Sequence, residues 1–205
     1  MASWRVIEHT GHTLVQLLKT HINRAISNVN VQLISTASFN LLNDTDTATI
    51  SLFLYQINEN AELRNAPQRV DTQGKLRRQP LALELCYMVT PWASRADNEP
   101  LTDTVAVQEE QRLMGLVMQA FYDGAELGPA DLYQEPVTPV WTPMDSLQIS
   151  LETLPIEDHY RIWDAAQLPY RLSVTYRVRV MGLDSTRVHG EARVEESTFH
   201  ARPNS

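Results

Sequence analysis

Two apolar runs, at residues 48–57 and 80–90, are the features that most restrict how this chain can fold. In the first run, apolar residues such as Ile50 and Phe53 occupy both even and odd positions. Side chains therefore leave both faces of the extended chain into apolar surroundings, which is typical of a strand covered on both sides. The two runs predict central strands of a sheet with a packed layer on each face.

The second run contains one charged residue, Glu84, and the one cysteine of the chain, Cys86. A carboxylate inside such a strand needs a charged or hydrogen-bonding partner, or a place at an edge. A single cysteine forms no intramolecular disulfide, and its apolar setting indicates a small buried side chain. A reactive thiol is the alternative interpretation of Cys86.

Apolar residues at three-to-four spacing predict helices elsewhere in the chain. The first spans residues 4–27, with Ser3 as its N-cap and with Gly11 weakening its first half. A second amphipathic helix is expected at 105–122, and a short one at 155–165. These helices are expected to pack on the sheet.

Further strands and loops complete the expected fold. Strands are predicted at 31–34, 147–151 and 170–183, the last with a basic outer face, and loops at 35–47, 58–79 and 128–143. The fold class is therefore α+β, a mixed and mainly antiparallel sheet with helices packed on it. Residues 1–185 are expected to form a single α/β domain, followed by a short C-terminal tail, 186–205, with one strand candidate at 192–196.

Composition limits the classes of function. The 205 residues are enough for one sizeable core, and the net charge of −8 argues against binding to nucleic acid. No stretch is long and apolar enough to span a membrane. Glu8 and His9 lie where a signal peptide would have its apolar centre, so we expect a soluble, cytoplasmic protein.

The charge is unevenly distributed, and this suggests surfaces that contact other proteins. Residues 64–78 hold five bases and one acid, whereas 97–135 hold nine acids and one base. Blocks of opposite sign suit docking between charge-matched surfaces, although solvated loops also produce them. Two tryptophans in connectors join the basic block as contact candidates, because aromatic residues are enriched at contact cores. The candidate interface residues are Arg64, Asn65, Arg69, Lys75, Arg77, Arg78, Trp92 and Trp141.

Patterns that carry chemistry are absent from the sequence. The seven glycines form no phosphate-binding loop, and no nucleophile elbow occurs. His9 and His12 share a helical face but have no third metal ligand at a convincing spacing. Glu109 and Glu110 lie near a helix start, where carboxylates are favoured for electrostatic reasons. We therefore expect no enzyme activity, no metal and no cofactor.

Four sequence blocks, in order, resemble one protein family. They are SLFLYQINENAELRN at 51–65, PLALELCYMVTPW at 80–92, EQRLMGLVMQA at 110–120 and LPYRLSVTYRVRV at 168–180. The resemblance is to the cap, or tail-terminator, proteins of extracellular contractile injection systems, which are phage-tail-like particles of antifeeding-prophage type. No single block would be specific, but four blocks in this order over residues 5–185 make a fairly specific match.

The resemblance implies a fold like that of phage tail terminators and a structural function. It implies a homo-oligomeric ring of six subunits that closes the baseplate-distal end of the inner tube and sheath and stops their polymerisation. The expected partners are the sheath and inner tube proteins of the same particle, which is assembled in the cytoplasm and released from the cell. A non-polymerising adaptor that joins cargo or baseplate to the particle remains an alternative. So does the terminator of a true contractile phage tail.

Overall fold

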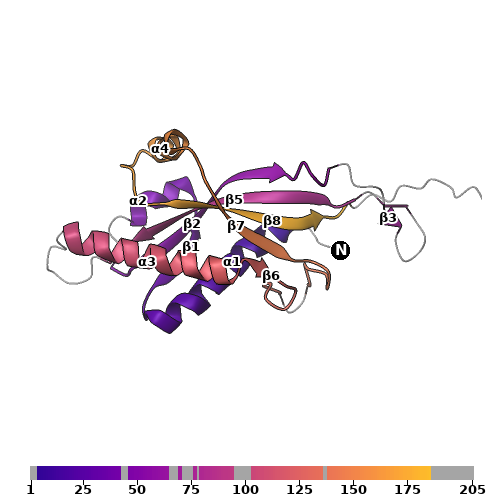
Figure 1. Ribbon diagram of the computed structural model, residues 1–205, viewed down its shortest axis with the longest axis horizontal. Helices are drawn as coiled ribbons and strands as arrows, with labels where there is room; N and C mark the ends of the chain where they lie inside the picture. Colours follow the sequence, from indigo (N-terminus) through magenta and orange to yellow (C-terminus); the bar gives the residue numbers. More distant parts are fainter. Residues whose placement is uncertain are drawn as a thin grey trace, which may run out of the picture.

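A computed structural model describes residues 4–42, 46–64, 69–70, 76–77, 79–94, 103–135 and 138–185. The elements along the chain are α1 (Val6–Ala25), β1 (Asn30–Ile34), a 3₁₀ turn (Thr36–Ser38), α2 (Phe39–Leu42), β2 (Thr49–Glu59), β3 (Arg69–Val70), β4 (Leu76–Arg77), β5 (Leu81–Trp92), α3 (Asp103–Asp123), β6 (Glu126–Leu127), β7 (Leu147–Glu152), α4 (Ile156–Ala165) and β8 (Val174–Leu183). In Figure 1, α1 and α3 lie below the sheet and α4 lies above it.

Among the described residues, six strands form the main sheet in the order β1-β2-β5-β8-β7-β6. β1 pairs with β2 in parallel, and every other pairing in this sheet is antiparallel. The short strands β3 and β4 pair with each other apart from it. The predicted fold class, a mixed and mainly antiparallel sheet with helices packed on it, is confirmed.

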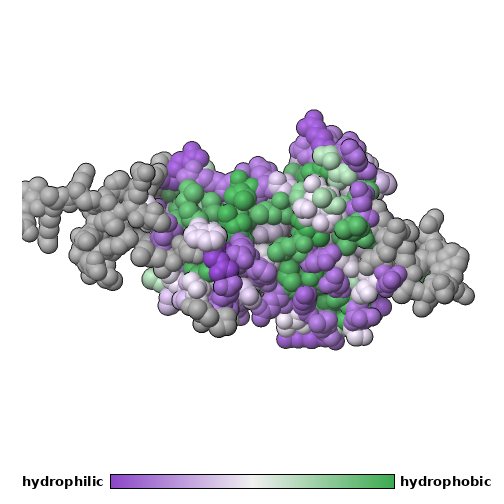
Figure 2. All heavy atoms as spheres, turned by 180° about the vertical axis from the view of Figure 1, so that it is seen from behind, coloured by the Kyte–Doolittle hydropathy of each residue, from purple (hydrophilic) through white to green (hydrophobic). Residues whose placement is uncertain are grey.

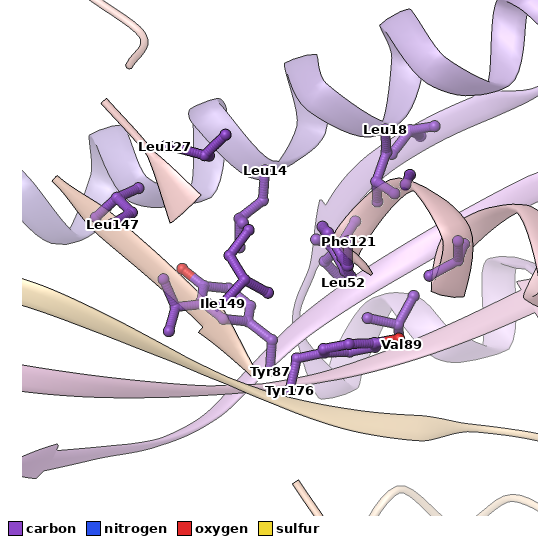
Figure 3. Packing of buried hydrophobic residues seen from close by; sticks show 14 of the residues in the cluster. Leu14, Leu18, Leu52, Tyr87, Val89, Phe121, Leu127, Leu147, Ile149 and Tyr176 are labelled. Carbon is purple, nitrogen blue, oxygen red and sulfur yellow. The ribbon is translucent and has the colours of Figure 1, made fainter. Parts of the chain in front are cut away.

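One face of the sheet packs against α1 and α3. Figure 3 shows Leu14 and Leu18 of α1 and Phe121 of α3 pointing toward Tyr87 and Tyr176 of the sheet. The rings of Phe121 and Tyr176 meet edge to face at 4.7 Å between centroids. This layer is the larger part of the core, and the periodicity of the two long helices predicted it.

A second, smaller layer covers part of the opposite face. The ring of Phe39, in α2, packs against those of Phe53, Trp92 and Trp163 at centroid distances of 5.2–6.1 Å. Residues 35–47 were expected to form a loop, and this expectation is wrong for α2. The segment is polar on average, but Phe39 is fully buried and fixes one helical turn onto the sheet.

Helix α1 differs from the prediction in its N-cap residue and in the role of Gly11. The N-cap position is held by Arg5, whose side chain makes no capping hydrogen bond, and Ser3 lies outside the described residues. Gly11 is buried within an unbroken helix. A Cβ atom at this position would come within 2.8 Å of a methyl carbon of Leu33, so the glycine allows α1 to approach β1 closely.

Several strand boundaries differ from the predicted ones. β5 extends to Trp92 because Thr49 and Ile50 of β2 pair with its last residues. β8 begins at Val174, four residues later than predicted, where pairing with β5 and β7 starts. Glu126 and Leu127, both within the acidic block at 97–135, form β6. The strand candidate at 192–196 lies outside the described residues.

The connector between β6 and β7 is fixed onto α1 through Tyr133. The carbonyl oxygen of Tyr133 lies 3.1 Å from Nδ1 of the buried His9, and its N–H donates to the Thr13 hydroxyl at 3.0 Å. Arg5 adds two hydrogen bonds of 2.6 Å to Glu135. The extended connector was predicted, whereas these contacts explain why it stays against the helix.

Candidate assembly interface

The basic segment predicted as an interface is described only in part. Arg64 is exposed and pairs with Glu59 at 3.0 Å. Arg69 and Arg77 are register partners in the β3–β4 pair. Asn65, Lys75 and Arg78 lie outside the described residues, as do the side chains of Arg69 and Arg77. The contact role of this segment therefore stays a prediction.

Trp92 does not lie on an exposed connector, and that expectation is corrected. It is the last residue of β5 and is 1% exposed. Its indole Nε1–H donates to the Ser51 hydroxyl at 2.8 Å, and the Arg171 guanidinium stacks 4.6 Å from the ring centroid. A side chain enclosed in this way has almost no surface left for a partner protein.

The expectation that Trp141 is an exposed contact residue is also corrected, because its side chain is buried. It does lie in the connector before β7, but it is only 6% exposed and belongs to the larger core layer. Its Nε1–H donates to the carbonyl oxygen of Tyr133 at 2.9 Å. Proline and threonine neighbours suggested exposure, whereas the connector folds back and turns the indole inward.

Charged residues on the second face of the sheet form a closed network. Glu84 accepts from Arg179 at 3.0 Å and lies 3.6 Å from Arg177. Arg177 also pairs with Glu152, which accepts from the Tyr55 hydroxyl at 3.2 Å. The partner expected for Glu84 is therefore present, and the basic face predicted for β8 is neutralised by acids from β5 and β7.

The pKa values of Cys86 and Tyr55 are shifted by these surroundings. Burial raises the pKa of the Cys86 thiol, and the nearby Glu152 carboxylate raises it further. Burial also raises the pKa of Tyr55, again with a contribution from Glu152. Both groups therefore remain protonated at neutral pH, which agrees with the interpretation of Cys86 as an inert, buried side chain.

Internal contacts also use part of the acidic block. Glu110 pairs with Arg171 at 2.8 Å, although burial raises the pKa of this carboxyl above its ordinary value. Glu135 pairs with Arg5, and the Asp131 carboxylate accepts from the backbone N–H of Gly128. Part of the negative charge in residues 97–135 is therefore used in contacts within the subunit.

An apolar groove lies between α3 and β7. It has a volume of about 470 Å³, and the side chains that shape it include Met118, Phe121, Tyr122, Ile149, Leu151 and Tyr176. Tyr122 is 85% exposed and Leu151 is 55% exposed. Figure 2 shows that apolar side chains reach the surface in several areas between polar ones. Apolar surface of this kind is characteristic of sites that bind another protein.

Sequence reasoning missed this groove although the signal was present. Met118 and Tyr122 are four residues apart and flank the buried stripe of α3. Leu151 continues the alternation of Leu147 and Ile149, but it lies past the part of β7 that pairs with β6 and is exposed. In the sequence alone, both patterns are typical of buried core positions. The exposure of these residues follows only from where the neighbouring elements end.

The described residues contain no metal-binding cluster. His9 and His12 are not accompanied by further ligands, and no group of three or more His, Cys, Asp or Glu side chains within these ranges is arranged to hold a metal. Among the helices in the same part of the chain, none has the length and apolar character needed to cross a bilayer.

Comparison with known proteins identifies the family. Residues 9–197 match the family described as the Pvc16 N-terminal domain. The chain belongs to this family. No curated protein matches the chain.

Two solved structures share the fold of this Pvc16 N-terminal domain protein. The first is a sheath/tube terminator, in its extended state, of the extracellular contractile injection system PVC; the TM-score is 0.61 at 18% identity, over 100% of this chain and 65% of that one. The second is the tube-terminating cap of the anti-feeding prophage, with a TM-score of 0.59 at 21% identity, over 95% of this chain and 61% of that one. The chain thus spans less than two thirds of the length of either protein. The resemblance to the cap and terminator family is confirmed.

Proposed function

We propose that this protein is the terminator of a contractile injection particle. Six copies form a ring that closes the baseplate-distal end of the inner tube and sheath and stops both from growing. The observation that carries the proposal is the likeness of fold to a sheath/tube terminator over the whole of this chain, in a protein of the Pvc16 N-terminal domain family. The second likeness, to a tube-terminating cap, points in the same direction.

The proposed role is structural, with no catalysis and no cofactor. Its partners are other copies of this chain and the sheath and inner tube proteins of the same particle. The particle is assembled in the cytoplasm and acts outside the cell. Residues 1–185 form the cap domain, and residues 186–205 form a tail to it. A closed ring of identical subunits needs two different and complementary surfaces on each subunit, and the unequal charge of residues 64–78 and 97–135 supports such a pair.

The test is to assemble particles from the tube and sheath proteins encoded with this protein, in its presence and in its absence. With the protein present, electron microscopy should show sheathed tubes of uniform length, each closed at one end by a ring. Without it, lengths should be broadly distributed and ends open. Equal length distributions in both samples, with no protein at the ends, would refute the proposal.

The same experiment separates the alternatives. An adaptor would bind a cargo or baseplate protein in pull-down and leave the length distribution unchanged. The terminator of a true phage tail would cap tubes in the same way, but the genes around it would encode a head and a DNA-packaging machinery.

A further inference from the structure

The outer edge of β7 is open beyond Ile149. β6 pairs with β7 only at Leu147 and Gln148, and the N–H of Ile149 donates to the carbonyl oxygen of Ala125 at 2.7 Å. Main-chain groups alternate in direction along an antiparallel strand, so those of Leu151, two residues on, also point outward. No main-chain partner accepts or donates there within the described residues.

At the opposite end of the sheet, no strand among the described residues pairs with the outer edge of β1. β1 pairs on one side with β2, and the N–H of Asn30 donates to the carbonyl oxygen of Ala48 on that side. The same alternation therefore turns the main-chain groups of Leu33 away from β2, toward solvent. The Leu33 side chain lies on the face covered by α1, where it contacts Gly11 and remains 41% exposed.

The strand directions and the sheet faces at the two edges would allow β1 of one copy to pair with β7 of another. Following the pairings from β1 through β2, β5 and β8 to β7, the strands at the two edges run in opposite directions. A rotation about an axis along the strands carries one copy to the next without reversing strands or exchanging faces. Under this rotation, β1 of one copy meets β7 of its neighbour in antiparallel orientation, with α1 and α3 on the same side.

The side chains at the two edges also agree. β1 has no ionisable residue, and Glu152 at the end of β7 is already neutralised by Arg177. Neither edge carries the lysine or proline that commonly protects an exposed strand from pairing. Leu151 and Leu33 both lie on the helix-covered face, so pairing would direct the leucine of one copy toward the apolar groove of the other.

We propose that the sheet continues from one copy of this chain to the next. β1 of one copy pairs with the free part of β7 of its neighbour, with Leu33 opposite Leu151 and its side chain in the groove beside Met118 and Tyr122. This inference rests on the proposed ring, and it specifies the contact that joins the subunits. In strand addition, an extended segment pairs with an exposed sheet edge through main-chain hydrogen bonds, and pockets that accept its side chains provide specificity.

Cysteine cross-linking in assembled particles tests the contact directly. The Leu33→Cys/Leu151→Cys variant is assembled with tube and sheath proteins, oxidised and run on a denaturing gel. Opposed residues of a hydrogen-bonded antiparallel pair lie about 5.5 Å apart at Cα, within the range that disulfides span. We expect a ladder of covalent oligomers. Each single variant, and the Ile57→Cys/Leu151→Cys control with a similarly exposed partner position, should give no ladder.

Proline variants test the main-chain pairing. Leu151→Pro and Leu33→Pro remove only an N–H that points outward, so the ladders within the subunit stay intact. We expect either variant to keep the circular dichroism of the wild type and to lose the ring in light scattering and at tube ends. Leu151→Lys, which places a charge at the edge, should have the same effect without a proline.

The outcomes distinguish this contact from the ring itself. Capped tubes of uniform length without a cross-linked ladder, and with ring formation unaffected by the proline and lysine variants, would overturn the edge pairing while the terminator function stands. Absence of capping by the wild-type protein would overturn the proposed function. A ladder with only the Ile57→Cys control would also contradict the assigned register.

Discussion

Trp92 joins three parts of the second core layer: the aromatic rings of α2 and α4, the Ser51 hydroxyl and the Arg171 guanidinium. Trp92→Ala should therefore lower the free energy of unfolding by about 3–5 kcal/mol, the usual effect of emptying a large buried aromatic site. Urea unfolding followed by circular dichroism measures the change. Tyr122→Ala, an equally aromatic but exposed change, should stay within about 0.5 kcal/mol of the wild type. A mild effect at Trp92 would restore it as an interface candidate.

Gly182 of β8 is the position where backbone conformation demands glycine. Its φ is +138°, and a Cβ atom there would lie 2.3 Å from Cβ of Pro80. Gly182→Ala should destabilise the protein by about 1–3 kcal/mol, because both the backbone strain and the clash must be relieved. Gly115 in α3 is the matched control, since no atom lies within 4 Å of its added Cβ. Gly115→Ala should be stabilising by about 0.5–1 kcal/mol, and thermal unfolding of both variants decides the comparison.

At the scale of elements, the Arg5–Glu135 pair ties the β6–β7 connector to α1, and it makes stability depend on pH. The hydrogen bonds from Arg5 hold the pKa of Glu135 below its ordinary value. The stability that this carboxylate contributes is therefore present above the unfolded-state pKa and is lost as pH falls through the folded-state pKa. Between roughly pH 5 and pH 3, the wild type should lose more unfolding free energy than Glu135→Gln.

Unfolding in urea at a series of pH values measures this difference. Glu135→Gln should be less stable at neutral pH, and the two curves should converge at acid pH, where the wild-type carboxyl is protonated. Glu109→Gln is a useful control, because Glu109 accepts a hydrogen bond from the Ser94 backbone and no arginine among the described residues pairs with it. Parallel pH profiles for wild type and Glu135→Gln would mean that the pair does not hold the connector.

At the scale of the whole molecule, assembly should respond to salt. The subunit carries a net charge of −8, with a basic segment at 64–78 and acids concentrated at 97–135. If these surfaces meet in the ring, rising ionic strength screens their attraction, since the Debye length falls from about 10 Å at 0.1 M to about 3 Å at 1 M. Light scattering over this range should show loss of a species of six times the subunit mass.

Charge reversal checks which surface is responsible. Replacing Arg64, Arg77 and Arg78 with glutamate should block assembly and leave the circular dichroism unchanged. Reversal of Arg161, an exposed arginine of α4, should leave both assembly and the circular dichroism unchanged. Rings that are insensitive both to salt and to the triple substitution would leave the sheet edges as the main contact.

The sequence alone determined the parts of this protein that depend on local pattern. Apolar residues at both even and odd positions of the runs 48–57 and 80–90 predicted two strands with both faces covered, because each apolar face of such a strand must be buried. The spacing of Leu14 and Leu18 predicted the first helix. Four blocks of residues in the right order indicated the family. Glu84 was recognised as needing a partner, although its position did not reveal which arginines would supply one.

Only the tertiary structure decided which of these residues reach the surface. Trp92 and Trp141 have the composition of exposed connectors around them, yet pairing with β2 and contact with Tyr133 turn both indoles into the core. Leu151 has the alternation of a core residue, yet it is 55% exposed in the groove between α3 and β7. Exposure is set by where neighbouring elements stop, and this depends on residues far apart in the sequence.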